Sequence, residues 1–377
     1  MSAQDALALA AKNRPALQAA KLHIEQAQKS AKATGAMLPT TIGLGASTRS
    51  EVGANDMDLF VNQPLDIFGR IQANRGAGKA EVQLARAEYF ASATTLQNET
   101  LTEFSSAVAA KHLTEVSEEL LKISEGLLQA TKRRFDEGKV AEIQVVRAGI
   151  EYERSKQYAE LKKSDLNSSL TRLSGLLAVP VTDIIVESDA QIQPLNNPAY
   201  ESRPDILTLK AQAEIAESEA GIAKVSNRPE FNLQVVRSPW STQPGYFVGR
   251  AQFTWAIFDH GKARNTLDAA KKRSEASNKL LDDAVLKAKA ELRAAQIEVD
   301  SRRSRISSYE AILASARELV AKSQKGYLEG FGTQIDVLEA TRALREVELE
   351  LVEARQQLSL AVIGQYRASG FLSEVLK

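Results

Sequence analysis

Two long stretches of the chain carry apolar residues three and four positions apart, a spacing that places them on one face of an α-helix. These stretches cover residues 70–136 and 262–328. Each is followed by a glycine, Gly138 after the first and Gly330 after the second. Glycine readily adopts the left-handed backbone conformation that ends a helix and lets the chain turn back. The pattern therefore predicts two long helices, each with a tight turn at its end.

A shorter helical pattern follows each turn, over residues 141–177 and 333–369. At 1.5 Å per residue, a long helix reaches about 100 Å and a returning helix only about 55 Å. The returning helices therefore cover only part of their long partners. Helical segments at residues 3–37, with a break before Pro15, and at residues 204–226 have the length to cover the remainder. We expect each long helix to lie against two shorter helices arranged in line.

Between these helices the period of the pattern changes to two, which is typical of β-strands with one apolar face. In residues 41–66, Ile42 and Leu44 alternate with glycines. In residues 231–256, Phe253 shares one face with other aromatic residues. Each segment is long enough for two strands, so the sequence predicts four strands in all.

The same order of elements occurs twice, at an offset of about 190 residues. We therefore expect two tandem structural repeats, residues 1–190 and 191–377. The landmarks that keep this register are Asn13-Arg14-Pro15 and Ser202-Arg203-Pro204, Pro39 and Pro229, Ile67-Phe68 and Ile257-Phe258, and Gly138 and Gly330.

Composition and charge exclude several classes of function. The chain has 48 basic and 48 acidic residues, so no net charge attracts it to nucleic acid. It has no cysteine, and its three histidines are not at the spacing of a metal site. No nucleophile, metal or cofactor constellation is present, so we expect neither an enzyme nor a cofactor. The first residues do not form a secretory signal, so we expect Met1 to be an added start before a mature sequence.

The strands and the helices both require several copies of the chain. Four strands cannot close a barrel, and an open sheet would leave unpaired edges. The smallest membrane barrels have about eight strands, so two copies would give eight strands and three would give twelve. The pattern alone leaves both numbers open. It predicts a mainly α-helical chain with a small β part that packs side by side with other copies.

With these features in order and repeated, the chain resembles the TolC-type outer-membrane efflux ducts over essentially its whole length. The matching motifs are the Asn-Arg-Pro and Ser-Arg-Pro openings, the helix-ending Pro39 and Pro229, the strand-to-helix corners PLDIFGR and WAIFDHGKAR, and the turns FDEG and YLEG. The resemblance implies a homotrimer that forms an α-helical barrel topped by a 12-stranded transmembrane β-barrel. It also implies a location in the outer membrane of a Gram-negative bacterium, in contact with outer-membrane lipid and extending into the periplasm. In such a barrel, Trp240, Tyr246 and Trp255 would be aromatic residues of the membrane interface.

The resemblance also implies the function, passive export of substrates in a tripartite efflux or type I secretion system. The partners would be an inner-membrane pump and a periplasmic adaptor (membrane fusion) protein. The cargo, whether drugs, metal ions or proteins, stays open. The family has a lipid-bearing N-terminal cysteine in one branch; this chain has none, so we expect the unacylated branch or a lost anchor residue.

Acidic residues at the periplasmic helix turns close the duct in this family, and the matching positions are Asp336 and Glu339. Three copies of each would form carboxylate rings around the pore, and such rings favour cations. Tyr327 matches an aromatic residue that anchors the turn, and Gln144 and Arg147 occupy the facing positions of the first repeat. Two acidic residues three positions apart on a helix usually lie on its solvent-exposed face. The gate role of this pair therefore follows only from the resemblance.

The two turns are the expected docking sites for the adaptor. The residues that form them are Gly138, Lys139, Val140, Gly330, Phe331, Gly332 and Thr333. Gly332 departs from the family pattern, because some members have a basic latch residue at this position. A contact between Arg147 and Glu339 is the alternative latch.

Two other classes of function are compatible with parts of the pattern. A soluble periplasmic coiled-coil adaptor or scaffold would use the hairpins to hold partners, but it has no need for strands with apolar faces. An enzyme would need a catalytic constellation, which the sequence lacks. A channel explains both the hairpins and the strands.

Overall fold

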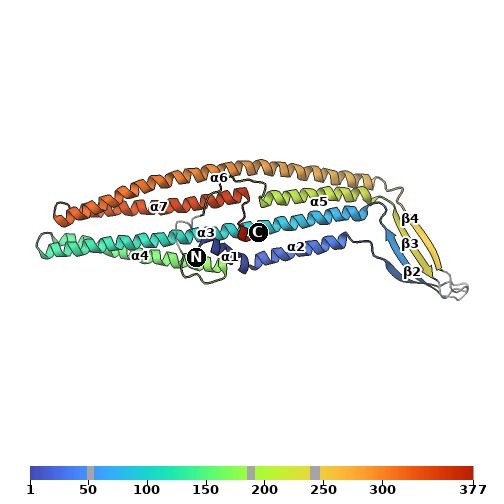
Figure 1. Ribbon diagram of the computed structural model, residues 1–377, viewed down its shortest axis with the longest axis horizontal. Coiled ribbons are helices and arrows are strands. Elements are labelled where there is room, and N and C mark those ends of the chain that lie inside the picture. Colours follow the sequence, from blue (N-terminus) through green and yellow to red (C-terminus); the bar gives the residue numbers. More distant parts are fainter. Residues whose placement is uncertain (49–54, 185–191, 238–246, 377) are drawn as a thin grey trace. The chain divides into compact units, whose positions relative to one another are not determined.

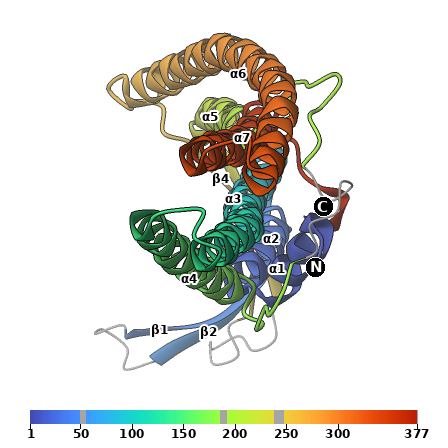
Figure 2. The same ribbon diagram turned by 90° about the vertical axis from the view of Figure 1, so that its left-hand side faces the viewer.

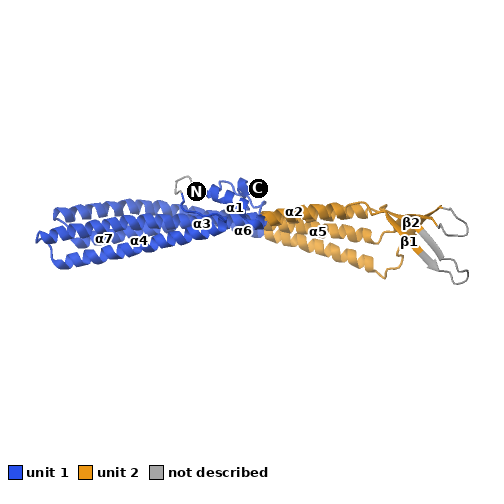
Figure 3. Ribbon diagram, turned by 90° about the horizontal axis from the view of Figure 1, so that it is seen from below, with its two compact units in different colours: residues 1–17, 91–203, 286–377 blue, residues 18–90, 204–285 orange. Residues whose placement is uncertain are grey.

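The computed structural model describes residues 1–48, 55–184, 192–237 and 247–376. The chain divides into two compact units (Figure 3). Unit 1 comprises residues 1–17, 91–203 and 286–377, and unit 2 comprises residues 18–90 and 204–285. Each unit therefore contains segments from both halves of the sequence.

The chain is mainly α-helical, with a small sheet (Figure 1). The elements are α1 (Ala3–Asn13), α2 (Pro15–Thr34), β1 (Thr41–Thr48), β2 (Asn55–Leu65), α3 (Arg70–Asp136), α4 (Glu142–Leu177), α5 (Pro204–Ser226), β3 (Glu230–Arg237), β4 (Phe247–Thr254), α6 (Lys262–Glu329), α7 (Gln334–Ser369) and the 3-10 helix η2 (Glu374–Leu376). The order helix, two strands, long helix, shorter helix occurs in each half. Within the described residues, no helix has an apolar stretch long enough to cross a lipid bilayer.

All four strands belong to unit 2 and form one antiparallel sheet in the order β1-β2-β3-β4. The register pairs Ile42 with Val61, Val61 with Val235, and Phe231 with Phe253. Residues directly opposite one another in antiparallel strands point to the same face of the sheet. Apolar residues of all four strands therefore share a face, as the alternating pattern predicts.

Two helical hairpins, α3 with α4 and α6 with α7, make up most of unit 1 (Figures 1 and 2). Helix α3 packs against both helices of the other hairpin. Leu120 of α3 lies in one apolar cluster with Val320 of α6 and Leu344 of α7. The apolar stripes that identified the helices in the sequence thus form the contact between the hairpins.

In unit 2, each long helix contacts one of the short helices. Arg75 of α3 donates from Nε to the carbonyl of Gly35, directly after α2 (2.8 Å). Arg273 of α6 forms an ion pair with Glu219 of α5 (2.7 Å). The short helices therefore supply neighbours for the parts of α3 and α6 that lie in this unit.

The turn between α3 and α4 is formed by a glycine in the left-handed conformation, Gly138, with a φ of 72°. The N–H of Lys139 donates to the carbonyl of Arg134 (2.8 Å), and the N–H of Gly138 donates to the carbonyl of Phe135 (2.8 Å). This pair of bonds is the Schellman motif, which satisfies the last carbonyls of a helix.

The turn between α6 and α7 has the same construction, and Gly330 has a φ of 90°. The N–H of Phe331 donates to the carbonyl of Gly326 (2.9 Å), and that of Gly330 donates to the carbonyl of Tyr327 (3.2 Å). Both glycines that the sequence marked as turn residues thus have backbone angles that favour glycine.

An aspartate lies just before each long helix and caps it. Both carboxylate oxygens of Asp66 accept backbone hydrogen bonds at the start of α3, from Arg70 (2.8 Å) and Ile71 (2.7 Å). Asp259 accepts backbone hydrogen bonds at the start of α6, from Ala263 (2.8 Å) and Gly261 (3.0 Å). The bonds from Ala263 and Gly261 lower the pKa of Asp259, because they stabilise the charged form.

Some elements differ in detail from the segments expected from the sequence. The helical segment at 3–37 consists of α1 and α2, and α2 ends at Thr34, directly before Gly35, a residue that disfavours helix. Residues 49–54, between β1 and β2, lie outside the described residues. In unit 1, α1 packs against η2 near the end of the chain.

Candidate functional site

The α3–α4 and α6–α7 turns lie at the same end of unit 1, where the candidate site residues of both repeats meet (Figure 1). Gln334, at the start of α7, donates from its Nε2 to the backbone carbonyl of Gln144 in α4 (2.7 Å). The side chain of Gln334 is buried. The structure therefore brings the two turns together by a direct polar contact between the hairpins.

Tyr327 is buried in this region, with an exposed fraction of 3%. It packs in a cluster with Leu127 and Val337, which come from α3 and α7. Its hydroxyl lies 3.0 Å from the Oγ1 of Thr131, and the guanidinium carbon of Arg134 lies 4.6 Å from the centre of its ring. Arg134 also donates from Nη1 to the carbonyl of Tyr327. Tyr327, for which the resemblance implies an anchoring role, is thus in contact with two polar side chains of α3.

Asp336 is exposed and caps the start of α7. Its carboxylate accepts hydrogen bonds from the N–H (2.8 Å) and the hydroxyl (2.8 Å) of Thr333, whose Oγ1 also lies 3.2 Å from the N–H of Asp336. Hydrogen bonds from Thr333, the backbone bond above all, lower the pKa of Asp336. The carboxylate therefore stays charged at neutral pH and stabilises the helix start.

Glu339 lies one turn further along α7 and is also exposed. Asp336 and Glu339 are three residues apart, so they lie on one face of the helix. Arg147 is exposed on α4, and within the described chain it makes no ion pair with Glu339. The side chains available for a gate are thus two solvent-facing carboxylates, one of which also has a capping role.

The turn residues that the sequence predicts as docking sites are mostly solvent-exposed. Phe331 is 91% exposed. Lys139 forms an ion pair with Glu137 (2.7 Å), which lowers the pKa of Glu137. Gly332 has a structural reason to be glycine, because a Cβ there would lie 3.1 Å from the backbone carbonyl carbon of Gly326. A larger residue would push the two segments of the turn apart.

Three residues of this region were not identified from the sequence: Thr131, Arg134 and Gln334. Each acts through a partner more than 180 positions away in the chain. The spacing of apolar residues along a helix can show that such a residue lies near the contact with another helix. It cannot show which polar group of the other helix faces that residue. The cap formed by Thr333 differs, because its partner is only three positions away and the spacing itself is a signal.

The sheet of unit 2 is a second candidate surface, for contact with lipid. The exposed apolar residues on its shared face include Ile42, Leu44, Leu233, Val235 and Phe253. The opposite face is mostly polar, and its residues include Asn62, Gln234 and Gln252.

Of the three aromatic residues expected at a membrane interface, Trp255 is the one that belongs to the described residues. Trp255 follows β4, is half-exposed, and donates from Nε1 to the carbonyl of Asn227 (3.1 Å). Trp240 and Tyr246 lie outside the described residues. The interface role of all three therefore stays a prediction.

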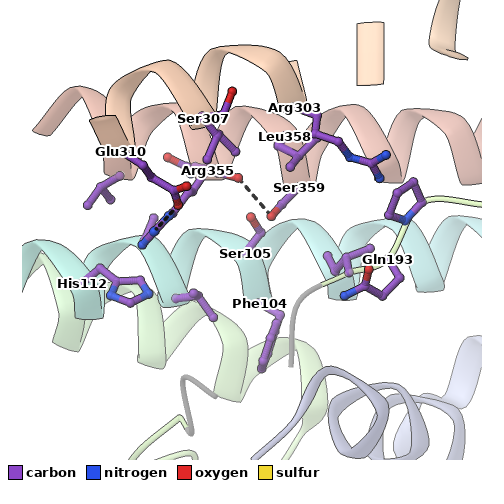
Figure 4. A pocket seen from close by; sticks show the side chains of 17 residues that line it. Phe104, Ser105, His112, Gln193, Arg303, Ser307, Glu310, Arg355, Leu358 and Ser359 are labelled. Carbon is purple, nitrogen blue, oxygen red and sulfur yellow. Dashed lines mark hydrogen bonds and ion pairs between the residues drawn. The ribbon is translucent and has the colours of Figure 1, made fainter. Parts of the chain in front are cut away.

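A cleft of about 580 Å³ lies in unit 1 between α3, α6 and α7, beside residues 192–194 (Figure 4). Phe104 and Ser105 line it from α3, and Glu310 and Arg355 line it from α6 and α7. The Nη2 of Arg355 donates to Glu310 (2.9 Å), so these two charges neutralise each other. The cleft was not expected from the sequence, and its lining does not resemble a catalytic constellation.

The described residues contain no group of three or more histidine, cysteine or acidic side chains that could hold a metal ion.

A model of a protein family described as outer membrane efflux protein matches residues 6–179 and 195–370. The nickel-cobalt-cadmium resistance protein NccC of Alcaligenes xylosoxydans xylosoxydans is 26% identical over 262 residues, which cover 68% of this chain and 59% of NccC. The chain thus matches less than two thirds of the length of NccC. The pyoverdine export outer membrane protein OpmQ of Pseudomonas aeruginosa is 24% identical over 391 residues, which cover 94% of this chain and 82% of OpmQ.

The fold is similar to that of solved outer-membrane channels. The open state of the MtrE outer membrane channel of Neisseria gonorrhoeae superposes with a TM-score of 0.80 at 18% identity, covering 98% of this chain and 89% of MtrE. At this identity the likeness concerns the fold.

Proposed function

The chain belongs to the outer membrane efflux protein family, and we propose that it forms the exit duct of a tripartite efflux or type I secretion system. The match of the family model to both halves of the chain carries this proposal. Substrates would arrive from an inner-membrane pump through a periplasmic adaptor and leave passively across the outer membrane. Neither the family description nor the similar structures support the alternative of a soluble adaptor.

Three copies of the chain would complete the duct. Within the described sheet, β1 and β4 are the outer strands, and each has one neighbour. Pairing of β4 with β1 of the next copy would remove the free edges, and three four-stranded sheets would give a 12-stranded barrel. The apolar face of the sheet supports an orientation toward lipid, and the mostly polar face supports an orientation toward the lumen.

The tandem repeats, residues 1–190 and 191–377, are part of the same proposal. The family model matches one segment in each half. The long helices α3 and α6 have 67 and 68 residues, and the returning helices α4 and α7 have 36 residues each. A duplication accounts for these similar lengths.

The mass of the particle tests the assembly. Light scattering coupled to size exclusion, on protein extracted in mild detergent, should give three times the 41.1 kDa of one chain after correction for detergent. A monomer that is stable in buffer without detergent would overturn the duct.

We propose that Asp336 and Glu339 form the gate and that Tyr327, Gln144 and Arg147 support it. Exposed carboxylates on one face of α7 support this role, because three copies would place rings of negative charge at the turns.

The exposed turn residues are the proposed docking surface for the adaptor, because Phe331 is a large apolar side chain that the chain itself leaves almost fully exposed. The glycine turns and their flanking residues would present this surface on both hairpins. Loss of adaptor binding in Phe331→Ser, with an unchanged particle mass, would support the docking role, and unchanged binding would contradict it.

Single-channel conductance of the reconstituted protein tests the gate. Glu339→Ala removes a carboxylate without touching the cap of α7, so we expect a larger conductance. Glu350→Ala is the matched control, because it removes an exposed carboxylate from the same helix, about 16 Å further from the turn. If Glu339→Ala conducts as the unmodified protein does, Glu339 is not part of a gate.

A further inference from the structure

Two ion pairs lie in unit 1 away from the turns. Nη1 of Arg345 in α7 is 3.8 Å from Oε1 of Glu151 in α4. Oε1 of Glu348 in α7 accepts hydrogen bonds from Nη2 (2.7 Å) and Nε (3.2 Å) of Arg317 in α6. We call these four residues the buried-glutamate pairs.

Both carboxylates of these pairs are buried. The side chains of Glu151 and Glu348 are 10% and 7% exposed, whereas those of Arg345 and Arg317 are 37% and 54% exposed. Removing a carboxylate from water is unfavourable, and a buried ion pair is often no more stable than an apolar pair of the same size. Stability alone therefore does not explain two buried glutamates. Fixing the register of packed elements is the better-attested role of such pairs.

The two buried-glutamate pairs connect different elements, because Glu348 and Arg317 belong to the same hairpin. The Glu151 pair joins α4 directly to α7, and the Nη2 of Arg317 also lies 4.0 Å from Glu119 of α3. Apolar seams between helices tolerate small sliding movements, whereas charged contacts require defined positions. The pair of Glu151 and Arg345 thus restricts sliding of one hairpin along the other.

The proposed gate lies between these pairs and the contacts at the turns. At the turns, Gln334 of α7 is bound to the carbonyl of Gln144 in α4. Glu339 follows Gln334, and Arg345 is six residues, about 9 Å, beyond Glu339 along the helix. The segment of α7 that carries the gate carboxylates is therefore fixed to α4 at both ends.

We propose that Glu151 and Arg345 are gate-positioning residues, which hold α7 against α4 and so limit opening at the turns, while Arg317 orients α7 through Glu348. This inference rests on the proposed channel function. Loss of the contact between Arg345 and Glu151 would release the gate-bearing segment at one end without altering the gate residues themselves.

The test is the fraction of time that single channels of the full-length protein are open in planar bilayers. Arg345→Gln and Glu151→Gln each remove the contact. We expect the open fraction to rise about tenfold. This is near the lower end of the changes that one site in a protein typically causes at another, because Arg345 is partly exposed and solvent weakens its ion pair. Glu151→Arg combined with Arg345→Glu restores an ion pair with reversed charges and should return the open fraction toward that of the unmodified protein.

The open fraction distinguishes a role of the ion pair in positioning the gate from a role in the stability of the assembled protein. A role in stability alone would lower the yield of assembled particles and leave each surviving channel unchanged. A role in positioning changes the behaviour of each channel while the particle mass stays the same.

Arg345→Gln leaves the buried Glu151 without its partner and can impair assembly. The double variant Glu151→Gln/Arg345→Gln contains no unpaired buried charge, so it keeps the test valid. Lys322→Gln is the matched control, because its pair with Glu318 (2.6 Å) lies exposed on α6 alone. We expect no change in the open fraction for this control.

Glu339→Ala distinguishes failure of this inference from failure of the channel function. If Glu339→Ala raises the conductance and the double variant leaves the open fraction unchanged, the positioning role is wrong and the duct stands. If the double variant raises the open fraction, the positioning role is supported whether or not Glu339→Ala has an effect. If the unmodified protein and every variant fail to conduct, both proposals are overturned.

Discussion

Tyr327 offers a direct test of how the turns are held together. The substitution Tyr327→Phe removes only the hydroxyl, which lies 3.0 Å from Oγ1 of Thr131. Thr131 keeps its own hydrogen bond to the carbonyl of Leu127 (2.8 Å), so no buried group loses its last partner. The expected cost is therefore that of one ordinary hydrogen bond, about 1 kcal/mol.

The substitution Tyr327→Ala removes the whole ring from its cluster with Leu127, Ala130 and Val337. Truncation of a buried aromatic residue costs about 3–5 kcal/mol, because the lost burial is accompanied by a cavity. The two substitutions thus differ several-fold in their expected free energy, although they change the same residue.

Amide hydrogen exchange of the protein in detergent measures both effects as local opening of residues 320–345. We expect about fivefold faster exchange for Tyr327→Phe and more than about 100-fold for Tyr327→Ala. Tyr309→Phe is the matched control, because Tyr309 lies on the same helix and its hydroxyl has no hydrogen bond within the described chain. Equal exchange in Tyr327→Phe and Tyr327→Ala would refute the reasoning.

Two further predictions concern the same turns. Gly330→Ala and Gly138→Ala place a side chain at a φ of 90° and 72°. Each substitution should therefore destabilise its turn by about 1 kcal/mol, measured by hydrogen exchange. Gly126→Ala, within α3 and with open space for a Cβ, should instead stabilise the helix. Asp336 has a lowered pKa in the folded chain, so its capping contribution is complete above its ordinary pKa of 3.8 and is lost as the pH falls from that value through the lower pKa. Exchange at the start of α7, corrected for the intrinsic effect of pH, should therefore accelerate below about pH 3.8, and an acceleration already at about pH 6 would contradict this assignment.

The turns could be predicted because their causes are local. A left-handed residue after a helix strongly favours glycine, so Gly138 and Gly330 mark the turns in the sequence itself. The capping box of Thr333 and Asp336 is equally local, yet the resemblance led only to a gate role for Asp336. The structure adds the cap, and this is why Glu339 is the cleaner position for testing the gate.

The contacts between the hairpins could not be predicted, because they join residues far apart in the chain. Thr131 and Tyr327 are separated by 196 positions, and Gln144 and Gln334 by 190. Which polar groups meet depends on the relative rotation and register of packed helices. A period in the sequence gives the face that each helix buries, but not the partner that the face meets.

The buried glutamates show that the apolar stripe of a helix does not define the whole of its buried face. The seam of α7 passes through Leu344 and Leu351, and Glu348 lies four residues after the first and three before the second. Glu348 is therefore on the buried side of the helix by the same spacing that identifies the seam. Its charge alone would place it on the surface, but α7 contacts both α6 and the other hairpin and so buries a wider face than one stripe. An acidic residue at such a position requires a cationic partner on a neighbouring helix, and Arg317 meets this requirement in α6.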